Sequence, residues 1–446
     1  MTSRASPAGA PVAGAGTVVI ETHGCKLNQA DSAILAREFA NAGYRLVDRR
    51  RDADIIVINT CTVTSTADSK ARQALRAAHR ANPQAVVVAA GCYPERAADD
   101  LRRIPEVSLV VGNRTKPDLV AMATAESAKR RGTPAQSRAY GDDNAQAGIL
   151  RRSRAMVKIQ EGCDQICAYC IVPKVRGRER SVPPAEIVAA IRSNLAAGFK
   201  EITLTGTQLG TYGFDLDGAD LPGLLDRILG ETELRRLRVS SLQAHEISSD
   251  LLKRWDDPRL CPHFHVPLQS GSDSVLKGMR RRYDTASFRK AVMTIRERVA
   301  DAAITTDLIA GFPGETEEDH AAGLALVGEI EFADAHVFPY SQRPGTSAHY
   351  MQDQVTPTEK RRRAQELSAI AEVGFERFRA QMKGKVRPVL WETARPLGNG
   401  AMLWSGLTDN YVRACTESNT ELENSISQAR LGDLHGKALR AIVLEG

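Results

Sequence analysis

The chain has 446 residues, of which 42% are hydrophobic and 26% charged, and its formal net charge is +6. This length exceeds one ordinary domain, and no run approaches the roughly 18 apolar residues of a membrane span, so we expect several domains and no membrane partner. The eight cysteines are too sparse for a disulfide framework, which favours a reducing, cytoplasmic setting, and the mildly basic balance permits an RNA partner.

Residues 1–16 are rich in Ala, Gly, Pro and Ser and lack the apolar stretch of a signal peptide, so they are predicted to form a disordered tail. The following segment, residues 17–125, alternates short apolar runs with stretches of helical spacing. This alternation predicts an N-terminal domain built on a parallel α/β sheet. Its predicted strands cover residues 17–21, 55–59, 85–90 and 108–111.

Cysteines follow three of these predicted strands, at Cys25, Cys61 and Cys92. The carboxyl ends of neighbouring parallel strands face one crevice, where ligands bind in open α/β sheets. We therefore expect three thiols that are far apart in sequence to meet in a cluster site. The alternative is three unrelated, buried core cysteines.

A polar, breaker-rich stretch at residues 126–150 is predicted to be a linker. The next segment, residues 151–382, again alternates strands and helices, with helical stretches such as 185–197 and 316–330. Six strand–helix units in succession predict a partial (β/α)6 barrel, whose active site would lie at the carboxyl ends of the strands. The predicted strands are 155–160, 201–205, 237–241, 263–268, 304–309 and 335–339.

A cysteine triplet, Cys163, Cys167 and Cys170, comes just after the first strand of this barrel. A structural zinc site wants four protein ligands, whereas three thiolates hold a 4Fe-4S cluster and leave one iron open for a substrate. The Cys-x3-Cys-x2-Cys spacing, with Tyr169 before the last cysteine, resembles the cluster-binding signature of radical S-adenosylmethionine enzymes.

Other strand ends carry small and polar residues that can approach a bound zwitterion, ribose or adenine. Each has a structural alternative, because glycine marks ordinary turns and serine or threonine caps helices; Thr316 with Asp319 resembles a capping box. The candidates are Gly206, Gln208, Ser241, Gln269, Ser270, Gly311, Phe312 and Glu315.

His263 and His265 near Cys261 do not form a convincing zinc site, since a fourth ligand is missing, and we expect hydrogen-bonded core histidines. Basic clusters are typical either of phosphate contacts or of solvated faces, and charge alone does not choose between them. They comprise Arg176, Arg178 and Arg180, then residues 280–282, and residues 360–363.

The final segment, residues 383–446, follows a long predicted helix at residues 357–382 and contains short strands separated by turn residues. This pattern predicts a small β-barrel that either binds RNA or closes the catalytic core. The predicted strands are 386–391, 401–405, 411–414 and 438–443.

The ordered motifs together resemble those of the radical S-adenosylmethionine (SAM) methylthiotransferases, over about residues 17–445. They include Gly24-Cys25-Lys-Leu-Asn, Asn59-Thr-Cys61-Thr-Val-Thr and Gly91-Cys92-Tyr, followed by the triplet, His265-Val-Pro-Leu-Gln-Ser-Gly-Ser and Asp307-Leu-Ile-Ala-Gly-Phe-Pro-Gly-Glu. The residues beside the cysteines are most similar to the bacterial branch that acts on N6-threonylcarbamoyladenosine in tRNA. The last domain resembles a TRAM domain.

The resemblance implies two 4Fe-4S clusters and SAM as cofactors. Cys163, Cys167 and Cys170 would hold the cluster that cleaves SAM to methionine and a 5′-deoxyadenosyl radical, which removes hydrogen from C2 of the modified adenine. Cys25, Cys61 and Cys92 would hold an auxiliary cluster carrying a sulfide, which a second SAM methylates before transfer to C2. Tyr169 and the strand-end candidates would line the SAM pocket. The implied partners are tRNA, an electron donor such as flavodoxin or ferredoxin, and a sulfur source.

Three other functions stay open. An enzyme of the same family acting on isopentenyladenosine in tRNA would share most of these motifs. An iron–sulfur electron-transfer or scaffold protein would need no SAM pocket. A zinc-stabilised RNA-binding module would contain zinc without sulfide.

Overall fold

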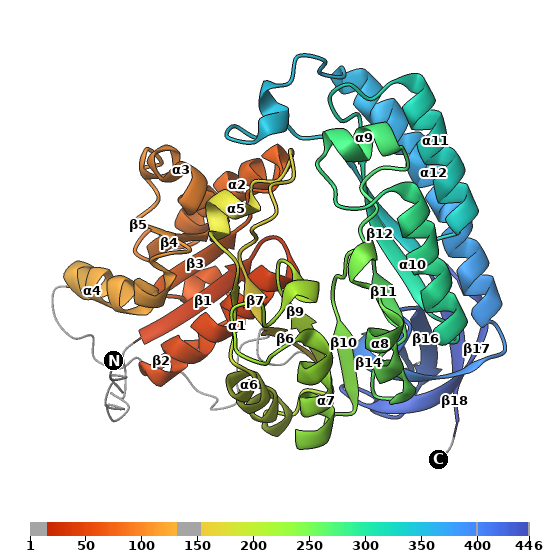
Figure 1. The fold of residues 1–446 in the computed structure, drawn as a ribbon. Coiled ribbons are helices and arrows are strands. Elements are labelled where there is room, and N and C mark those ends of the chain that lie inside the picture. The colour runs from red at the N-terminus through yellow and green to blue at the C-terminus, as the bar shows by residue number, and fades with distance from the viewer. Residues whose placement is uncertain (1–15, 132–152, 398–399, 445–446) are drawn as a thin grey trace. The chain divides into compact units, whose positions relative to one another are not determined.

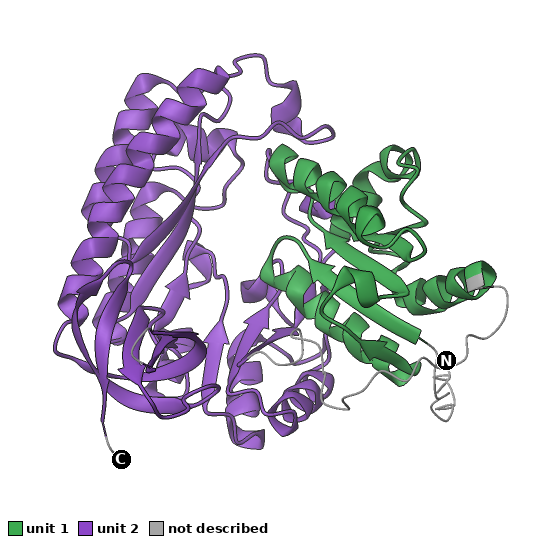
Figure 2. Cartoon of the chain, turned by 180° about the vertical axis from the view of Figure 1, so that it is seen from behind, with its two compact units in different colours: residues 1–151, 174–176 green, residues 152–173, 177–446 purple. Residues whose placement is uncertain are grey.

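The structure is a computed structural model that describes residues 16–131, 153–397 and 400–444. The predicted tail, apart from Gly16, and most of the predicted linker lie outside these residues. The chain divides into two compact units: residues 1–151 with 174–176, and residues 152–173 with 177–446 (Figure 2). Among the described residues, none of the helices combines the length and apolar character that a bilayer span requires.

A parallel sheet forms the centre of the first unit, with strand order β2-β1-β3-β4-β5 (Figure 1). The four strands predicted from the sequence are present, within two residues at each end. The short β2 was missed, because three residues are too few to show a periodicity. The strands are β1 (Gly16–Thr22), β2 (Tyr44–Leu46), β3 (Ile55–Thr60), β4 (Val86–Gly91) and β5 (Leu109–Gly112).

Helices cover both faces of this sheet. Helices α1 (Lys26–Asn41) and α4 (Leu119–Arg131) pack on one face, through Phe39 and Leu119, and α2 (Ser65–Ala81) and α3 (Cys92–Arg102) pack on the other, through Leu75 and Leu101. The central strands are therefore buried on both sides, which explains their continuous apolar sequences. Helix α4 occupies the start of the predicted linker.

The second unit contains the predicted partial barrel. Its strands form two parallel sheets, β6-β9-β10 and β11-β12-β13, which isolated bridges between Leu237 and Leu260 and between Ser241 and His265 join in chain order. The strands are β6 (Arg154–Lys158), β9 (Glu201–Thr205), β10 (Arg236–Val239), β11 (His263–His265), β12 (Ala303–Ala310) and β13 (Asp334–Pro339).

The outer helices of the barrel pack on the strands in two hydrophobic clusters. One cluster joins β6, β9 and β10 to the first helices of the unit, and the other joins β11 and β12 to the later ones, where α11 and α12 lie side by side (Figure 1). These helices are α6 (Pro184–Ala196), α7 (Leu221–Glu231), α8 (Ser249–Leu252), α9 (Asp273–Gly278), α10 (Thr285–Arg298), α11 (Glu317–Ile330) and α12 (Pro357–Met382).

Short elements complete the barrel unit. The ribbon of β7 (Gln160–Glu161) and β8 (Arg180–Ser181) brackets the cysteine loop, together with helix α5 (Val172–Arg176). The 3-10 helices of the chain are Arg50–Asp52, Lys116–Asp118, Leu209–Thr211, Ala244–Glu246, Lys253–Asp256 and Ser347–Tyr350.

The final segment forms a closed barrel, in the order β14-β15-β16-β18-β17, around a core that includes Trp391 and Trp404. The sequence analysis predicted no strand at β17, because its polar and apolar residues follow no clear period. Its strands are β14 (Val386–Pro396), β15 (Met402–Thr408), β16 (Arg413–Ser418), β17 (Ile426–His435) and β18 (Ala438–Val443).

This closed barrel is bound to the amino-terminal ends of β9 and β10. Arg236 donates to the carbonyl oxygens of Leu407 and Thr408, at 3.1 and 2.8 Å, and Arg238 donates to that of Asp409 at 2.9 Å. Both guanidinium groups also pair with Glu201, whose side chain is fully buried. The closed barrel does not cover the opposite, carboxyl ends of these strands, where the candidate functional site is expected.

Candidate functional site

Cys25, Cys61 and Cys92 lie at the carboxyl ends of three adjacent strands of the first unit. Cys25 caps α1 after β1, Cys61 directly follows β3, and Cys92 begins α3 directly after β4. Because β1, β3 and β4 are neighbours in the sheet, the topology brings these cysteines to one edge.

The other two cysteines affect the pKa of the Cys61 thiol. The pKa of Cys61 is raised to about 12, chiefly by burial and also by electrostatic interaction with Cys25 and Cys92, while the backbone N–H of Val63 lowers it. Charges act on each other in this way only at short range in a protein. The three sulfurs therefore share one neighbourhood.

Two glycines make this close approach possible. Gly24 has φ +117°, and a Cβ atom there would lie 2.6 Å from Cys61 Cβ. Gly91 has φ +96°, and its Cβ would lie 2.5 Å from the side-chain oxygen of Asn59. The glycines of the Gly24-Cys25 and Gly91-Cys92 pairs thus have a steric cause.

Asparagine side chains hold the same neighbourhood together. The amide of Asn28 donates to the carbonyl oxygen of Thr60 at 3.0 Å, and that of Asn59 donates to the carbonyl oxygen of Asn28 at 2.9 Å. Asn113 Nδ2 lies 3.5 Å from Cys92 Sγ, at hydrogen-bonding distance for sulfur. These bonds fix the start of α1 against the end of β3.

The second triplet lies on the loop between β7 and α5. The backbone N–H of Cys163 donates to the carbonyl oxygen of Gly177 at 3.2 Å, and that of Cys170 donates to the carbonyl oxygen of Cys167 at 3.1 Å. The N–H of Ala168 donates to Met279 at 3.0 Å. Backbone bonds therefore hold the loop at both its ends and its centre.

The thiols of this triplet also act on one another. The pKa of Cys170 is raised to about 12 and that of Cys163 to about 11, chiefly by burial and also by electrostatic interaction with Cys167. Arg281 Nη1 lies 3.4 Å from Cys167 Sγ, so a cation faces these sulfurs.

An amide network connects the triplet loop to Gln208, one of the predicted pocket residues. The Gln243 amide donates to Gln165, between Cys163 and Cys167, at 3.1 Å, and to Gln208 at 2.5 Å. Gln208 in turn donates to Glu246, whose pKa is raised by burial. The network was missed because Gln165 and Gln208 are far along the chain from Gln243 and Glu246.

The glycine turn after β9 is shaped by Gln160. Its side-chain oxygen accepts from the backbone N–H groups of Thr207 and Gln208, at 2.8 and 2.9 Å. A Cβ on Gly206 would lie 3.0 Å from both oxygen atoms of Gln160, so glycine is required there for close approach. Gly206 and Gln208 thus lie at a rigid strand end, as predicted.

The candidates after β10 and β11 also lie at strand ends. Ser241 bridges to His265, and Gln269, with φ +68°, bridges to Leu308. A non-glycine residue in the left-handed region costs energy and marks a backbone that its surroundings hold in place. Ser270, beside Gln269, accepts from the N–H of Ser272 at 3.3 Å.

Gly311, Phe312 and Glu315 are accounted for by contacts inside the protein. Glu315 accepts from the N–H of Gly311, at 3.1 Å, and from Arg363, at 2.9 Å. Phe312 is 1% exposed and packs in a cluster that includes Ala168, with Tyr169 against its edge. Phe312 and Tyr169 thus pack with the triplet loop, while the assignment of Glu315 to a SAM pocket remains a prediction.

His263 and His265 form hydrogen bonds inside the barrel, as expected. Nε2 of His263 lies 3.2 Å from Thr305 Oγ1, and Nε2 of His265 lies 3.2 Å from Asp307 Oδ2. His336 lies on the other side of Asp307, at 3.3 Å. Although burial opposes it, the bonds to the two histidines hold the pKa of Asp307 far below its usual range.

The basic clusters divide into exposed and buried members. Arg178 is 90% exposed, as expected of a solvated face, whereas the side chain of Arg176 is only 3% exposed. Arg281 and Arg363 likewise bind groups inside the protein. The sequence could not identify these buried arginines, because their partners lie far away along the chain.

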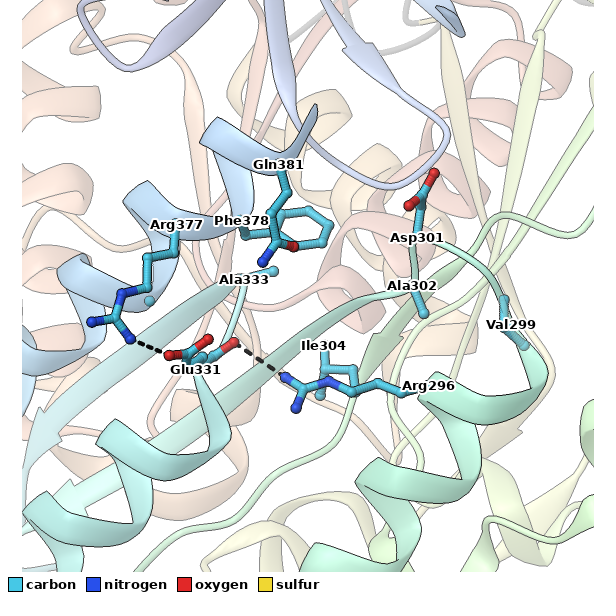
Figure 3. Close-up of a pocket in the computed structure, with 11 residues that line it drawn as sticks. Arg296, Val299, Asp301, Ala302, Ile304, Glu331, Ala333, Arg377, Phe378 and Gln381 are labelled. Atoms are coloured by element: carbon cyan, nitrogen blue, oxygen red, sulfur yellow. Dashed lines mark hydrogen bonds and ion pairs between the residues drawn. The ribbon is translucent and has the colours of Figure 1, made fainter. Parts of the chain in front are cut away.

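A cavity of about 340 Å³ lies at the other end of the barrel strands (Figure 3). Its lining includes Ala302 and Ala333, which directly precede β12 and β13. Glu331 bridges Arg377 and Arg296 there, through its carboxylate and its carbonyl oxygen. Active sites of barrels lie at the carboxyl ends, so this cavity is not the candidate site.

Both triplets fit iron–sulfur clusters by their donor sets. All eight cysteines are free thiols, and no three His, Cys, Asp or Glu side chains of the described residues are placed to hold a single metal ion. In a cubane cluster each thiolate binds a different iron, so the ligands stand further apart than around one ion. Three cysteines each, without a fourth protein ligand, would leave one iron of such a cluster open.

Comparison with known proteins agrees with this geometry. Residues 17–112 match the Uncharacterized protein family UPF0004, and residues 157–325 match the Radical SAM superfamily. The chain is also similar in fold to the radical SAM methyltransferase TsrM of Kitasatospora setae, with a TM-score of 0.53, 18% identity and 75% of each chain covered.

Curated relatives match nearly the whole chain. The threonylcarbamoyladenosine tRNA methylthiotransferase MtaB of Bacillus subtilis is 34% identical over 93% of both chains, and that of Aquifex aeolicus is 34% identical over 91% of this chain and 98% of its own. The tRNA-2-methylthio-N(6)-dimethylallyladenosine synthase of Syntrophobacter fumaroxidans is 36% identical over 95% of both chains. The chain therefore belongs to the radical SAM tRNA methylthiotransferases, enzymes that bind SAM and a 4Fe-4S cluster.

Proposed function

We propose that this enzyme transfers a methylthio group to C2 of N6-threonylcarbamoyladenosine, next to the anticodon of tRNA. It would use two SAM molecules and two 4Fe-4S clusters. The observation that carries the proposal is the pair of separate three-cysteine sites, each at the carboxyl ends of parallel strands.

Cys163, Cys167 and Cys170 would hold the radical SAM cluster. When bound, this group supplies the radical chemistry that an unactivated C–H bond requires, for which no side-chain base suffices. The protein then has to orient SAM beside the triplet. Gln208 and Gln243 would take part in this, and the hydrogen bonds that link their amides to the triplet loop through Gln165 support the assignment.

The remaining pocket assignments extend along the same edge of the barrel. Gly206 allows the backbone to approach a bound zwitterion, while hydroxyl and amide groups can bind ribose. These groups belong to Ser241, Gln269 and Ser270, at the ends of the next strands. Gly311, Phe312, Glu315 and Tyr169 complete the proposed pocket.

Cys25, Cys61 and Cys92 would hold the auxiliary cluster and present the sulfur to be transferred. Cys25 is exposed, whereas Cys61 and Cys92 are buried, so the site is open on one side. An open side is what a sulfur donor and the target adenine need. The electron donor, such as flavodoxin or ferredoxin, and the sulfur source would act with the enzyme as partners.

The choice of threonylcarbamoyladenosine rests on the residues beside the cysteines and on the names of relatives. Relatives that act on dimethylallyladenosine match with similar identity, so overall identity does not separate the two substrates. The isopentenyladenosine reaction is therefore the second candidate.

The test is a direct comparison of the two substrates. Anaerobically reconstituted enzyme is incubated with SAM, a reductant and sulfide, and with tRNA that carries one or the other modified adenosine, and nucleosides are analysed by mass spectrometry. We expect the 2-methylthio form only of threonylcarbamoyladenosine. Variants lacking either cysteine triplet are the controls, and thiolation of isopentenyladenosine alone would overturn the substrate assignment.

A further inference from the structure

Arg176 is a buried arginine of the first unit, although it follows the second cysteine triplet in the sequence. Residues 174–176 belong to the first unit, and the Arg176 side chain is only 3% exposed (Figure 2). Its Nη2 donates to Asn28 Oδ1 at 2.5 Å, and its Nη1 lies 3.2 Å from Asp31 Oδ2. A guanidinium that is desolvated to this degree needs such partners.

The partners of Arg176 connect it to all three cysteines of this unit. Asn28 lies one turn after Cys25 and donates its amide to the carbonyl oxygen of Thr60, the residue before Cys61. Asn113 connects the third cysteine, since its amide lies 2.7 Å from the carbonyl oxygen of Val175 and 3.5 Å from Cys92 Sγ. The segment 175–176 therefore lies directly behind the ligand framework.

A second cation, Lys116, lies beside the same carboxylate as Arg176. Lys116 Nζ also lies 2.8 Å from Asp31 Oδ2, with side chains only 12% and 2% exposed, so two cations share one carboxylate. Both cationic side chains are largely desolvated, so water screens their charges weakly.

We propose that Arg176 is a positioning residue of the auxiliary cluster, which fixes its three thiolates and raises its reduction potential. The inference rests on the auxiliary cluster of the proposed function. A cluster with three thiolates is anionic and becomes more negative on reduction, and a nearby buried cation stabilises the reduced form more than the oxidised form. Arg176 and Asn113 then tune the cluster without binding it.

The experiment isolates the auxiliary cluster in the full chain. In a Cys163→Ala/Cys167→Ala/Cys170→Ala background, Arg176→Gln and Arg176→Lys are reconstituted anaerobically, and iron content and the midpoint potential are measured, the latter by a redox titration followed by electron paramagnetic resonance. Arg178→Gln is the matched control, because Arg178 is two residues away and 90% exposed.

We expect the background to bind about four irons and Arg176→Gln to lower the midpoint potential. Arg176→Lys keeps the charge but not the two-pronged contact with Asn28 and Asp31, so it should retain the potential while binding less iron. The Arg178→Gln control should have the same iron content and the same midpoint potential as the background.

Other outcomes separate the inference from the proposed function. A background that binds no iron would contradict the auxiliary cluster itself. A background with iron, whose midpoint potential is unchanged in Arg176→Gln, would overturn the role of Arg176. If Arg176→Gln does not fold, as judged by circular dichroism, the Arg176→Lys variant decides: unaltered iron content would then overturn the positioning role.

Discussion

The guanidinium of Arg281 lies 3.4 Å from the sulfur of Cys167, measured from Nη1 to Sγ, and its other amino group donates to Gln243 at 2.9 Å. One arginine thus joins a cysteine of the second triplet to the amide network beside it. Arg281 also lies over the ring of Tyr283, 4.7 Å from its centroid, which fixes its plane.

Replacing Arg281 by Gln should impair the radical SAM site and leave the other triplet intact. The change removes the cation at Cys167 and one partner of Gln243, and loss of such an outer contact typically costs about 10- to 100-fold in metal affinity or activity. Reductive cleavage of SAM to 5′-deoxyadenosine, measured by chromatography, should fall accordingly. Arg282→Gln is the control, since Arg282 is exposed, and equal cleavage by both variants would contradict the prediction.

Iron and sulfide content should separate the two cysteine sites. We expect about eight irons in the reconstituted wild type and about four in each variant in which one triplet is replaced by alanine, because each set would hold one cluster. The count is made by colorimetric iron and sulfide assays. If the wild type binds only four irons, and all are lost when the second triplet is replaced, the proposed auxiliary cluster is wrong.

Gly24→Ala should weaken the first cysteine site for a steric reason. The new Cβ would lie 2.6 Å from Cys61 Cβ, at a backbone φ of +117°. The backbone beside Cys25 or Cys61 must therefore move. We expect a loss of about 1–3 kcal/mol of stability and of most auxiliary iron, measured in the background without the second triplet. Gly198→Ala is the control, because Gly198 also has positive φ but open space around it. Full iron content in Gly24→Ala would refute the steric account.

Glu201→Gln should lower the free energy of unfolding at neutral pH and change how this free energy depends on pH in acid. Burial alone would raise the pKa of Glu201, but Arg238 and Arg236 lower it to about 2, from 4.5. The carboxylate therefore stabilises the fold above about pH 4.5, and this contribution is lost as the pH falls toward about 2. Leaving two buried guanidinium groups without it should cost about 3–5 kcal/mol at neutral pH.

The measurement is urea unfolding of cluster-free protein at several pH values, followed by tryptophan fluorescence. Trp391 and Trp404 report on the closed barrel that Arg236 and Arg238 bind. The difference between wild type and Glu201→Gln should be constant near neutral pH and shrink in acid. Glu231→Gln, which breaks the helix-surface pair with Arg227, should cost about 1 kcal/mol or less. A difference for Glu201→Gln that grows in acid would contradict the assignment.

Local patterns in the sequence were sufficient to predict the order and approximate bounds of most strands and helices. Strand β9 and helix α12 occupy the predicted ranges, because hydrophobic periodicity reflects which face is buried. The short β2 and the mixed-polarity β17 were missed, since neither shows a clear period. The position of Cys25, Cys61 and Cys92 at adjacent strand ends followed from chain order and the rule for parallel sheets.

The surroundings of the cysteines depended on contacts between distant segments. Arg176 and Arg281 lie in basic clusters whose sequence is typical of solvated or phosphate-binding faces, and only the folded chain shows that Arg176 pairs with Asp31 and that Arg281 faces Cys167. Asn113 and Gln243 are ordinary polar residues in the sequence. The cysteine spacing by itself thus determined which ligands are offered, because it is a local property. The tertiary structure decided which charges and amides face those ligands, because burial next to a sulfur depends on the packing of segments far apart in the chain.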